Sequence, residues 1–179
     1  NDTSDDHAWV WTVLLAAIFL ITLVLSLPSP HAQADADGKT SLRVMTYNTQ
    51  QSIDGFAEKS FEAQLDLMRQ VSPDIISMQE TDSTRISLNN NDYVRYFADG
   101  LGYYSYYGPK TVTGTFGTAI LSRFPLENTR TSFMYSDKDE IGVAEAEVEV
   151  GGLRFTIYDV HPASSDAAML AFAQALLQR

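Results

Sequence analysis

The stretch that most constrains the fold is an apolar run within residues 73–82 that leads directly into a carboxylate. Ile75, Ile76 and Met78 predict a short buried strand that begins just after a proline. Glu80 then lies at the carboxyl end of this strand, where open α/β sheets position their chemistry. The ordinary alternative is a surface glutamate just past a strand, and further strands of the same design weigh against that alternative.

Two other apolar runs also end in a polar side chain. Residues 42–47 run into Asn48, and residues 153–160 run into His161. Because strand ends at one edge of a sheet can converge, we predict that Asn48, Glu80 and His161 lie close together. Each residue alone also has a structural explanation, since the asparagine can close a turn and the histidine can cap the last strand.

These three side chains suit metal-assisted phosphoryl chemistry. Mg²⁺ takes oxygen ligands and few protein carboxylates, and it leaves positions for water and phosphate, so Glu80 is the predicted metal ligand. Asn48 would orient a phosphate oxygen or the nucleophile, and His161 would donate a hydrogen bond to the phosphate. Mn²⁺ is the alternative cation. The chain has no cysteine, so any metal must be held by oxygen or imidazole ligands.

The charge balance narrows the class of substrate. The chain carries 23 acidic residues against 12 basic ones, a formal charge of −11, and its sequence contains no run of lysine and arginine. Such a surface repels polyanions. Composition therefore weighs against long nucleic acid as a substrate, and it makes no prediction of oligomeric state.

Residues 8–27 form an uncharged, strongly apolar segment after an acidic flank at residues 1–7. Twenty such residues are long enough to cross a bilayer as a helix. Trp9 and Trp11 fit an interfacial belt at one end, and Pro28 would stop the helix at the other. We therefore predict one transmembrane helix and a membrane-inserted protein.

The rival interpretation of this segment is a cleaved signal peptide, with Ala-Gln-Ala at residues 32–34 as the cleavage site. It is disfavoured because signal peptides begin with positive charge and this flank is acidic. Lys39 and Arg43 follow the segment, which taken literally would place the globular domain inside. Two charges carry little weight, and the expectation we keep is an extracytoplasmic or lumenal domain.

The remaining chain reads as a polar linker, residues 28–41, followed by one folded domain, residues 42–179. Strands and helices mix in an order typical of an α/β sandwich with helices outside. Helices are predicted around residues 61–68 and 92–101 and from about residue 165. Strands are predicted at residues 103–107, 117–122, 144–150 and 153–160. A hairpin turn is predicted at Gly151-Gly152 and a solvated loop at residues 137–140.

Four ordered motifs, at residues 42–48, 73–80, 117–125 and 158–161, resemble those of the endonuclease/exonuclease/phosphatase superfamily. The resemblance implies a four-layered α/β sandwich of DNase I-like type and a divalent cation. By matched position it implies Glu80 as metal ligand, Asn48 as the active-site asparagine and His161 as the phosphate-contacting histidine.

A narrower resemblance covers residues 79–82, 91–99 and 103–117. These stretches are similar to the C-terminal domain of the fungal proteins that exchange GPI-anchor lipid for ceramide, and to that of their animal counterparts. In that group the domain follows a multi-span membrane region. The resemblance therefore implies a membrane lipid or a lipid-linked phosphate as the partner of the site.

Two departures from the superfamily pattern change the expectation. The later Gly-Asp-x-Asn and Ser-Asp-His motifs are absent from the printed sequence. We therefore expect the chain as given to be C-terminally truncated relative to the superfamily and catalytically incomplete. His161 is followed by Pro162 where leucine is usual, which changes the expected geometry of that strand end.

The function predicted from the sequence is a membrane-tethered, Mg²⁺-dependent phosphodiesterase or phosphatase-like hydrolase. Its substrate would be a lipid-linked phosphate of GPI or sphingolipid type. Two alternatives stay open. One is a surface or secreted nuclease, and the other is a non-catalytic module on the same fold that binds a headgroup or a partner.

Overall fold

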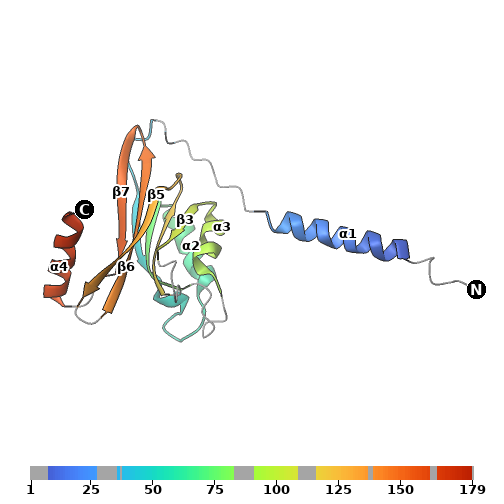
Figure 1. Cartoon of the computed structure of the whole chain (residues 1–179), viewed down its shortest axis with the longest axis horizontal. Helices are drawn as coiled ribbons and strands as arrows, with labels where there is room; N and C mark the ends of the chain where they lie inside the picture. Colours follow the sequence, from blue (N-terminus) through green and yellow to red (C-terminus); the bar gives the residue numbers. More distant parts are fainter. Residues whose placement is uncertain are drawn as a thin grey trace, which may run out of the picture. The chain divides into compact units, whose positions relative to one another are not determined.

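A computed structural model describes residues 8–27, 36, 38–82, 91–108, 116–136, 139–161 and 165–178. The chain divides into two compact units, Asn1–Pro30 and His31–Arg179 (Figure 1). The predicted acidic flank, residues 1–7, and most of the predicted linker lie outside the described residues.

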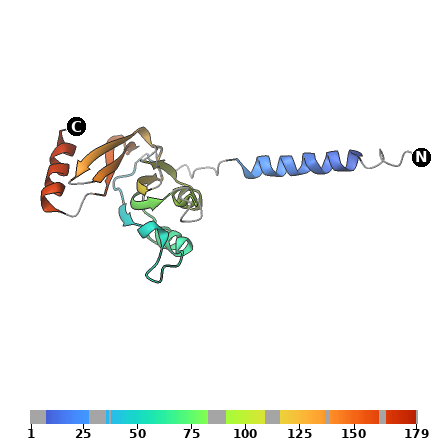
Figure 2. The same ribbon diagram turned by 60° about the horizontal axis from the view of Figure 1, so that its bottom comes forward.

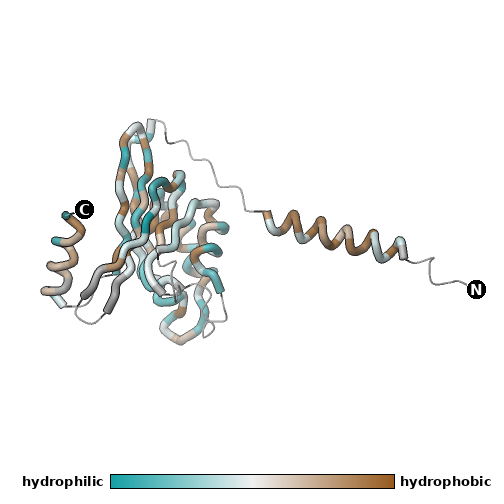
Figure 3. The backbone as a smooth tube through the Cα atoms, in the orientation of Figure 1, coloured by the Kyte–Doolittle hydropathy of each residue, from teal (hydrophilic) through white to brown (hydrophobic). Residues whose placement is uncertain are grey.

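The first unit consists of one helix, α1 (Ala8–Leu25). The helix is apolar along most of its length (Figure 3), and nearly all of its large apolar side chains, from Trp9 to Leu25, are exposed. Within the part of the chain that the structure describes, no helix is long and apolar enough to cross a membrane. The transmembrane helix predicted over residues 8–27 is thus not found among the described residues, and the helix that is observed there, α1, ends at Leu25 with 18 residues.

The second unit is built on two sheets, as far as the described residues show (Figure 1). The first has the order β1-β2-β4-β3 and the second the order β5-β6-β7. β1 runs parallel to β2, and the other neighbours are antiparallel. The strands are β1 (Val44–Asn48), β2 (Ile75–Asp82), β3 (Tyr104–Tyr107), β4 (Phe116–Ser122), β5 (Glu127–Ser136), β6 (Asp139–Val150) and β7 (Leu153–Val160).

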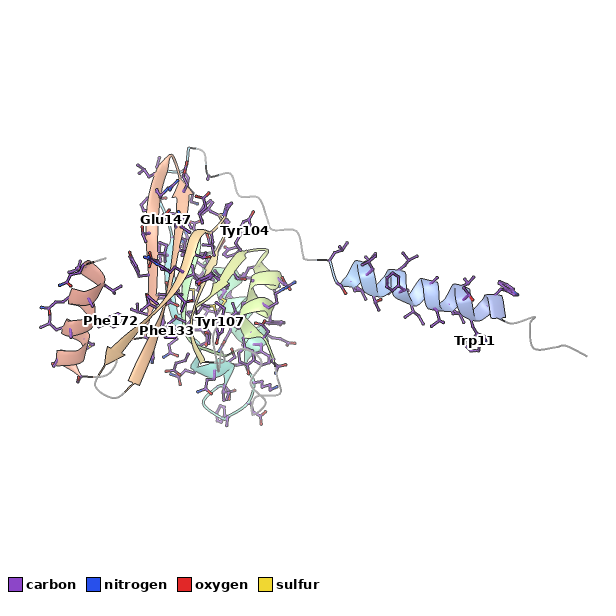
Figure 4. All side chains as sticks on the ribbon, viewed as in Figure 1. Trp11, Tyr104, Tyr107, Phe133, Glu147 and Phe172 are labelled. Carbon is purple, nitrogen blue, oxygen red and sulfur yellow. The ribbon has the colours of Figure 1, made fainter. Side chains whose placement is uncertain are left out.

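Helices cover the outer faces of both sheets, which gives four layers (Figure 1, Figure 2). α2 (Phe61–Val71) and α3 (Tyr93–Leu101) pack on the first sheet, and α4 (Asp166–Leu177) packs on the second. Phe172 of α4 is buried against Val143 in the second sheet (Figure 4). The four-layered α/β architecture predicted from the sequence is thus present in the described residues.

The continuous apolar character of β2 follows from its position between two layers. Ile75 contributes to the core between the two sheets, whereas Ile76 and Met78 contribute to the core under α2 and α3. All three side chains are fully buried. A strand covered on both faces has no need of the apolar–polar alternation seen in half-exposed strands.

The turn between β6 and β7 forms as predicted. Gly151 and Gly152 have φ angles of +61° and +73°. A two-residue hairpin with positive φ at both positions matches the right-handed twist of the strands, and glycine adopts it without steric cost.

The second sheet departs from the sequence prediction at β5, a strand that was not predicted. Residues 137–140 were expected to be a solvated loop, but Asp139 and Glu140 begin β6 and pair with the end of β5; residues 137 and 138 are outside the description. Arg130 of β5 also donates a hydrogen bond of 2.6 Å to Glu145 of β6. Ladder pairing satisfies main-chain groups whatever the side-chain polarity, so the charged composition was a poor guide here.

Candidate active site

The structure brings the three sequence-predicted site residues together. Asn48 ends β1, Glu80 lies in β2, and His161 directly follows β7. Asn48 Nδ2 donates a hydrogen bond of 2.8 Å to Glu80 Oε1. His161 Nε2 lies 3.6 Å from the same oxygen. One carboxylate oxygen is therefore the meeting point of side chains from three strands.

Glu80 is positioned by a bulge rather than by the end of a strand. β2 continues to Asp82, but its register with β4 shifts between Met78 and Thr81. Glu80 has a φ of +50°, which side chains other than glycine seldom adopt. Bulges of this kind redirect a side chain and often lie beside functional sites. The prediction that Glu80 ends its strand is corrected accordingly, and the bulge leaves its side chain 22% exposed.

Asn48 is held in one orientation by the turn that follows it. Its Oδ1 accepts a hydrogen bond of 2.9 Å from the Gln50 main-chain N–H, at the start of the short 3₁₀ turn η1 (Gln50–Ser52). The amide nitrogen therefore points to Glu80. The contact that closes the turn and the contact with Glu80 are thus made by the same side chain.

A cavity of about 480 Å³ adjoins the site on the Asn48 side. Gln50 and Gln64 contribute polar groups to its lining, and Tyr47 and Leu67 contribute apolar ones. A space of this size, with few polar groups among apolar ones, is typical of small-ligand sites.

The side chain of His161 is 43% exposed, against 22% for that of Glu80. Its distance of 3.6 Å from Glu80 Oε1 is longer than a hydrogen bond. Pro162, expected to change the local strand geometry, lies outside the described residues.

A buried polar pair beneath the site was missed from the sequence. Gln79 Nε2 donates a hydrogen bond of 2.6 Å to Asp159 Oδ1, and Thr46 Oγ1 lies 3.3 Å from Gln79 Oε1. These contacts join β1, β2 and β7, the strands that carry Asn48, Glu80 and His161. The two partners are 80 positions apart, and the only sequence signal is that each precedes a predicted site residue by one or two positions.

Asp159 is almost completely buried, with 1% of its surface exposed. Burial raises the pKa of this carboxyl to about 7, although the Gln79 amide and nearby peptide N–H groups work in the opposite direction. Its Oδ2 has no hydrogen-bond partner among the described residues. The polar layer under the site therefore contains a carboxyl that titrates near neutral pH.

The side chains at the site fit Mg²⁺ or Mn²⁺ better than Zn²⁺. No cluster of three histidine, cysteine, aspartate or glutamate side chains suited to a metal occurs among the described residues. Glu80 offers one carboxylate, and both of its side-chain contacts there use Oε1. Mg²⁺ and Mn²⁺ are often bound through one or two carboxylates, with water and substrate phosphate completing the shell. Zn²⁺, which takes three or four nitrogen, sulfur or carboxylate ligands, does not fit.

Comparison with known proteins places the domain in a family. A family model described as the PGAP2IP C-terminal nuclease-like domain matches residues 39–172. Protein cwh43 of Schizosaccharomyces pombe is 31% identical over 101 residues, which is 56% of this chain. The match covers 10% of that protein, so this chain corresponds to a small part of its relative.

Solved structures agree on the fold. A protein of the endonuclease/exonuclease/phosphatase family from Leptotrichia buccalis has a TM-score of 0.61 at 15% identity, over 78% of this chain and 61% of that chain. TDP2 from Caenorhabditis elegans has a TM-score of 0.55 at 21% identity, over 81% and 44%. ANGEL2, a 2′,3′-cyclic phosphatase, has a TM-score of 0.54 at 16% identity, over 68% and 41%. These matches span about half of each neighbour and establish the fold alone. With the family model matching most of its length, the chain belongs to the PGAP2IP C-terminal nuclease-like domains of the endonuclease/exonuclease/phosphatase superfamily.

Proposed function

We propose that this domain hydrolyses a phosphoric ester in a lipid-linked substrate of GPI or sphingolipid type, at a membrane and with a divalent cation bound at Glu80. The observation that carries the proposal is the convergence of Asn48 and His161 on Glu80 Oε1. A carboxylate that contacts an amide and an imidazole, and that pairs with no lysine or arginine among the described residues, can bind an external cation.

Each residue has a role that follows from its contacts. Glu80 would hold Mg²⁺, or Mn²⁺ in its place, and the cation supplies Lewis-acid polarisation of a phosphate oxygen. Asn48 would keep the carboxylate of Glu80 in place through its amide nitrogen. It also lines the adjoining cavity, where the substrate would bind. His161 is exposed enough to reach a phosphate oxygen and donate a hydrogen bond to it. Gln79 and Asp159 are positioning residues that fix the separation of β2 and β7.

Three features support a lipid-linked substrate. The net charge of −11 disfavours a long polyanion. The exposed apolar surface of α1 would hold the protein at a membrane, with the folded domain on the extracytoplasmic or lumenal side. The similarity to protein cwh43 and to the PGAP2IP family model agrees with the narrower resemblance from which the GPI-type substrate was inferred.

The test is hydrolysis by the full-length protein, with Mg²⁺ and with chelator, on GPI-type and sphingolipid phosphodiesters in vesicles. Glu80→Gln should lower the Mg²⁺-dependent rate by about 100-fold or more, because a developing phosphate charge would lose its cation. Glu149→Gln, which changes an exposed glutamate on β6, is the matched control and should keep the wild-type rate. Wild-type hydrolysis by Glu80→Gln would refute the metal-ligand role.

The second candidate is a non-catalytic module that binds a headgroup or a partner. It is favoured by one observation, the lack of a three-residue metal cluster in the described part of the chain. Headgroup binding without hydrolysis, unchanged by chelator, would support it. Plasmid DNA in the same assay serves the nuclease alternative, which predicts Mg²⁺-dependent nicking and no lipid hydrolysis.

A further inference from the structure

A second polar cavity lies at the opposite end of the first sheet from the candidate active site. Asp74 immediately precedes β2, six positions before Glu80, which is about 20 Å along an extended strand. The cavity has a volume of about 470 Å³, and the basic residues Lys39, Arg43 and Arg123 line it together with Asp74.

The fold creates a local excess of positive charge here that the sequence does not display. Lys39 Nζ lies 2.9 Å from Asp74 Oδ1, and Arg123 Nε lies 3.7 Å from the same oxygen. Asp74 Oδ2 accepts a hydrogen bond of 2.9 Å from the Arg43 main-chain N–H. Asp74 therefore contacts two basic side chains and the main-chain N–H of a third basic residue, in a protein whose net charge is −11.

Asp74 cannot balance that excess by itself. Burial acts to raise its pKa, but the Arg43 N–H and the Lys39 ammonium outweigh burial and bring the pKa below its ordinary value. The carboxylate is thus ionised at neutral pH, and the lining has a formal charge of about +2 from its three bases and one acid. The Asp74 side chain is 6% exposed, whereas those of Lys39 and Arg123 are each 30% exposed, so the cavity presents the cations rather than the anion.

The guanidinium of Arg123 is held rigidly. Its Nη2 donates hydrogen bonds of 2.9 Å to Ser72 Oγ and to Tyr103 Oη. Arg43 is fixed in turn by a 2.7 Å hydrogen bond from Nη1 to the Val71 carbonyl oxygen. Arginines oriented before a ligand arrives lose little entropy on binding, and their planar groups suit phosphate oxygens. The hydroxyls of Ser41 and Ser72 also line the cavity and can add hydrogen bonds.

An apolar cavity of about 280 Å³ adjoins the basic cavity. It shares Lys39 and Leu42 with the basic cavity and adds Val150, Leu153 and Phe155. Leu153, at the β6–β7 hairpin, is 63% exposed. A charged recess beside an apolar one suits a ligand that carries both a phosphate and an apolar part.

We propose that this basic cavity binds a phosphate dianion, supplied either by an anionic lipid headgroup or by a soluble phosphate ester. The site is independent of Glu80 and goes beyond the proposed hydrolysis. Its charge, its oriented arginines and its hydroxyls are the features that recognise phosphate.

The first experiment is calorimetric titration of the 179-residue chain with inorganic phosphate at constant ionic strength. Lys39→Gln and Arg43→Gln should each weaken binding about tenfold, since each removes one charge-assisted contact. Arg154→Gln, which changes an exposed arginine paired with Glu147, is the matched control and should bind as wild type does. Glu80→Gln should also bind phosphate normally, so failure of the hydrolysis proposal leaves this result unaffected.

The proposal is overturned if wild type shows no phosphate binding, or if Lys39→Gln and Arg154→Gln bind alike. Because Lys39 also pairs with Asp74, the fold of each variant is checked by thermal unfolding. Arg43→Gln removes a side chain that donates a hydrogen bond to the Val71 carbonyl oxygen, and it decides the outcome if Lys39→Gln does not fold.

A vesicle assay distinguishes the two sources of phosphate. Wild type and Lys39→Gln are compared on phosphatidylcholine vesicles with and without phosphatidic acid, where α1 contributes equally to both proteins. Stronger binding to phosphatidic acid that disappears in Lys39→Gln identifies a lipid headgroup. Loss of inorganic phosphate binding in Lys39→Gln, with no vesicle difference, identifies a soluble ester. Absence of both effects refutes the site.

Discussion

Two carboxylates at opposite ends of β2, one just before the strand and one in its bulge, have contrasting surroundings. Asp74, before the strand, is 6% exposed and is surrounded by Lys39, Arg123 and a peptide N–H. Glu80, in the bulge near the other end, is 22% exposed and contacts only an amide and an imidazole among the described residues. A buried charge with bases beside it is part of the structure, whereas a charge without them can bind an external cation.

The largest effect on stability is expected from Asp74→Asn. Removing the carboxylate leaves Lys39 and Arg123 close together without their shared partner, and the expected loss is about 3 kcal/mol in the free energy of unfolding. Glu80→Gln should change the same free energy by about 0.5 kcal/mol or less, because no lysine or arginine among the described residues pairs with that carboxylate. Urea denaturation at pH 7 measures both. Equal losses in the two variants would break the comparison between the two ends of the strand.

The Glu80 end of the strand could be predicted from the sequence because its signal is local. An apolar run followed by a polar residue appears at Asn48, Glu80 and His161 alike, and sheet geometry brings such ends together. The bulge at Glu80 has no comparable signal, since nothing in the residues around it demands a positive φ. The ladder of β5 was missed for a related reason: its polar side chains hide a strand that main-chain pairing stabilises.

The Asp74 end could not be predicted because it depends on contacts between distant segments. Lys39, which precedes Asp74 in the chain, and Arg123, which follows it, both contact the Asp74 carboxylate. Gln79 and Asp159, which form a hydrogen bond, are 80 positions apart. Propensity and periodicity describe neighbours along the chain. Pairings of this kind are created only when the sheets assemble.

Asp159 gives the second largest effect, and it depends on pH. Its pKa is about 7 in the folded protein and 3.8 without burial, so the folded state binds the proton more tightly. The stability linked to this group is complete below pH 3.8 and is lost as pH rises to about 7. Asp159→Asn removes the charge and keeps an acceptor for Gln79. The free energy of unfolding of Asp159→Asn should therefore rise relative to that of wild type between pH 4 and pH 8, by on the order of 2 kcal/mol.

Unfolding free energies of wild type and Asp159→Asn at a series of pH values provide the measurement. Asp166→Asn, at the exposed start of α4, is a control that should track wild type. A difference between Asp159→Asn and wild type that does not change with pH would mean that the buried carboxyl is charged throughout.

Gly151→Ala is expected to give the smallest effect and to disturb only the Asp74 end. Gly151 has a φ of +61°, and a Cβ there would meet the Lys39 carbonyl oxygen at 2.4 Å. The substitution should cost about 1 kcal/mol and displace Lys39 from Asp74. Gly152→Ala also has positive φ but no atom within 4 Å of the added Cβ, so a larger loss in Gly151→Ala isolates the contact with Lys39. Equal losses of stability in the two variants would show that the approach of Gly151 to the Lys39 carbonyl oxygen does not contribute.

The central claim is that Glu80 is the carboxylate reserved for a divalent cation. Binding of Mn²⁺ to the 179-residue chain, followed by electron paramagnetic resonance, tests it without requiring catalysis. The claim predicts that Glu80→Gln weakens Mn²⁺ binding at least about tenfold, while Glu149→Gln binds Mn²⁺ as wild type does. Equal Mn²⁺ affinities in wild type and Glu80→Gln would contradict it.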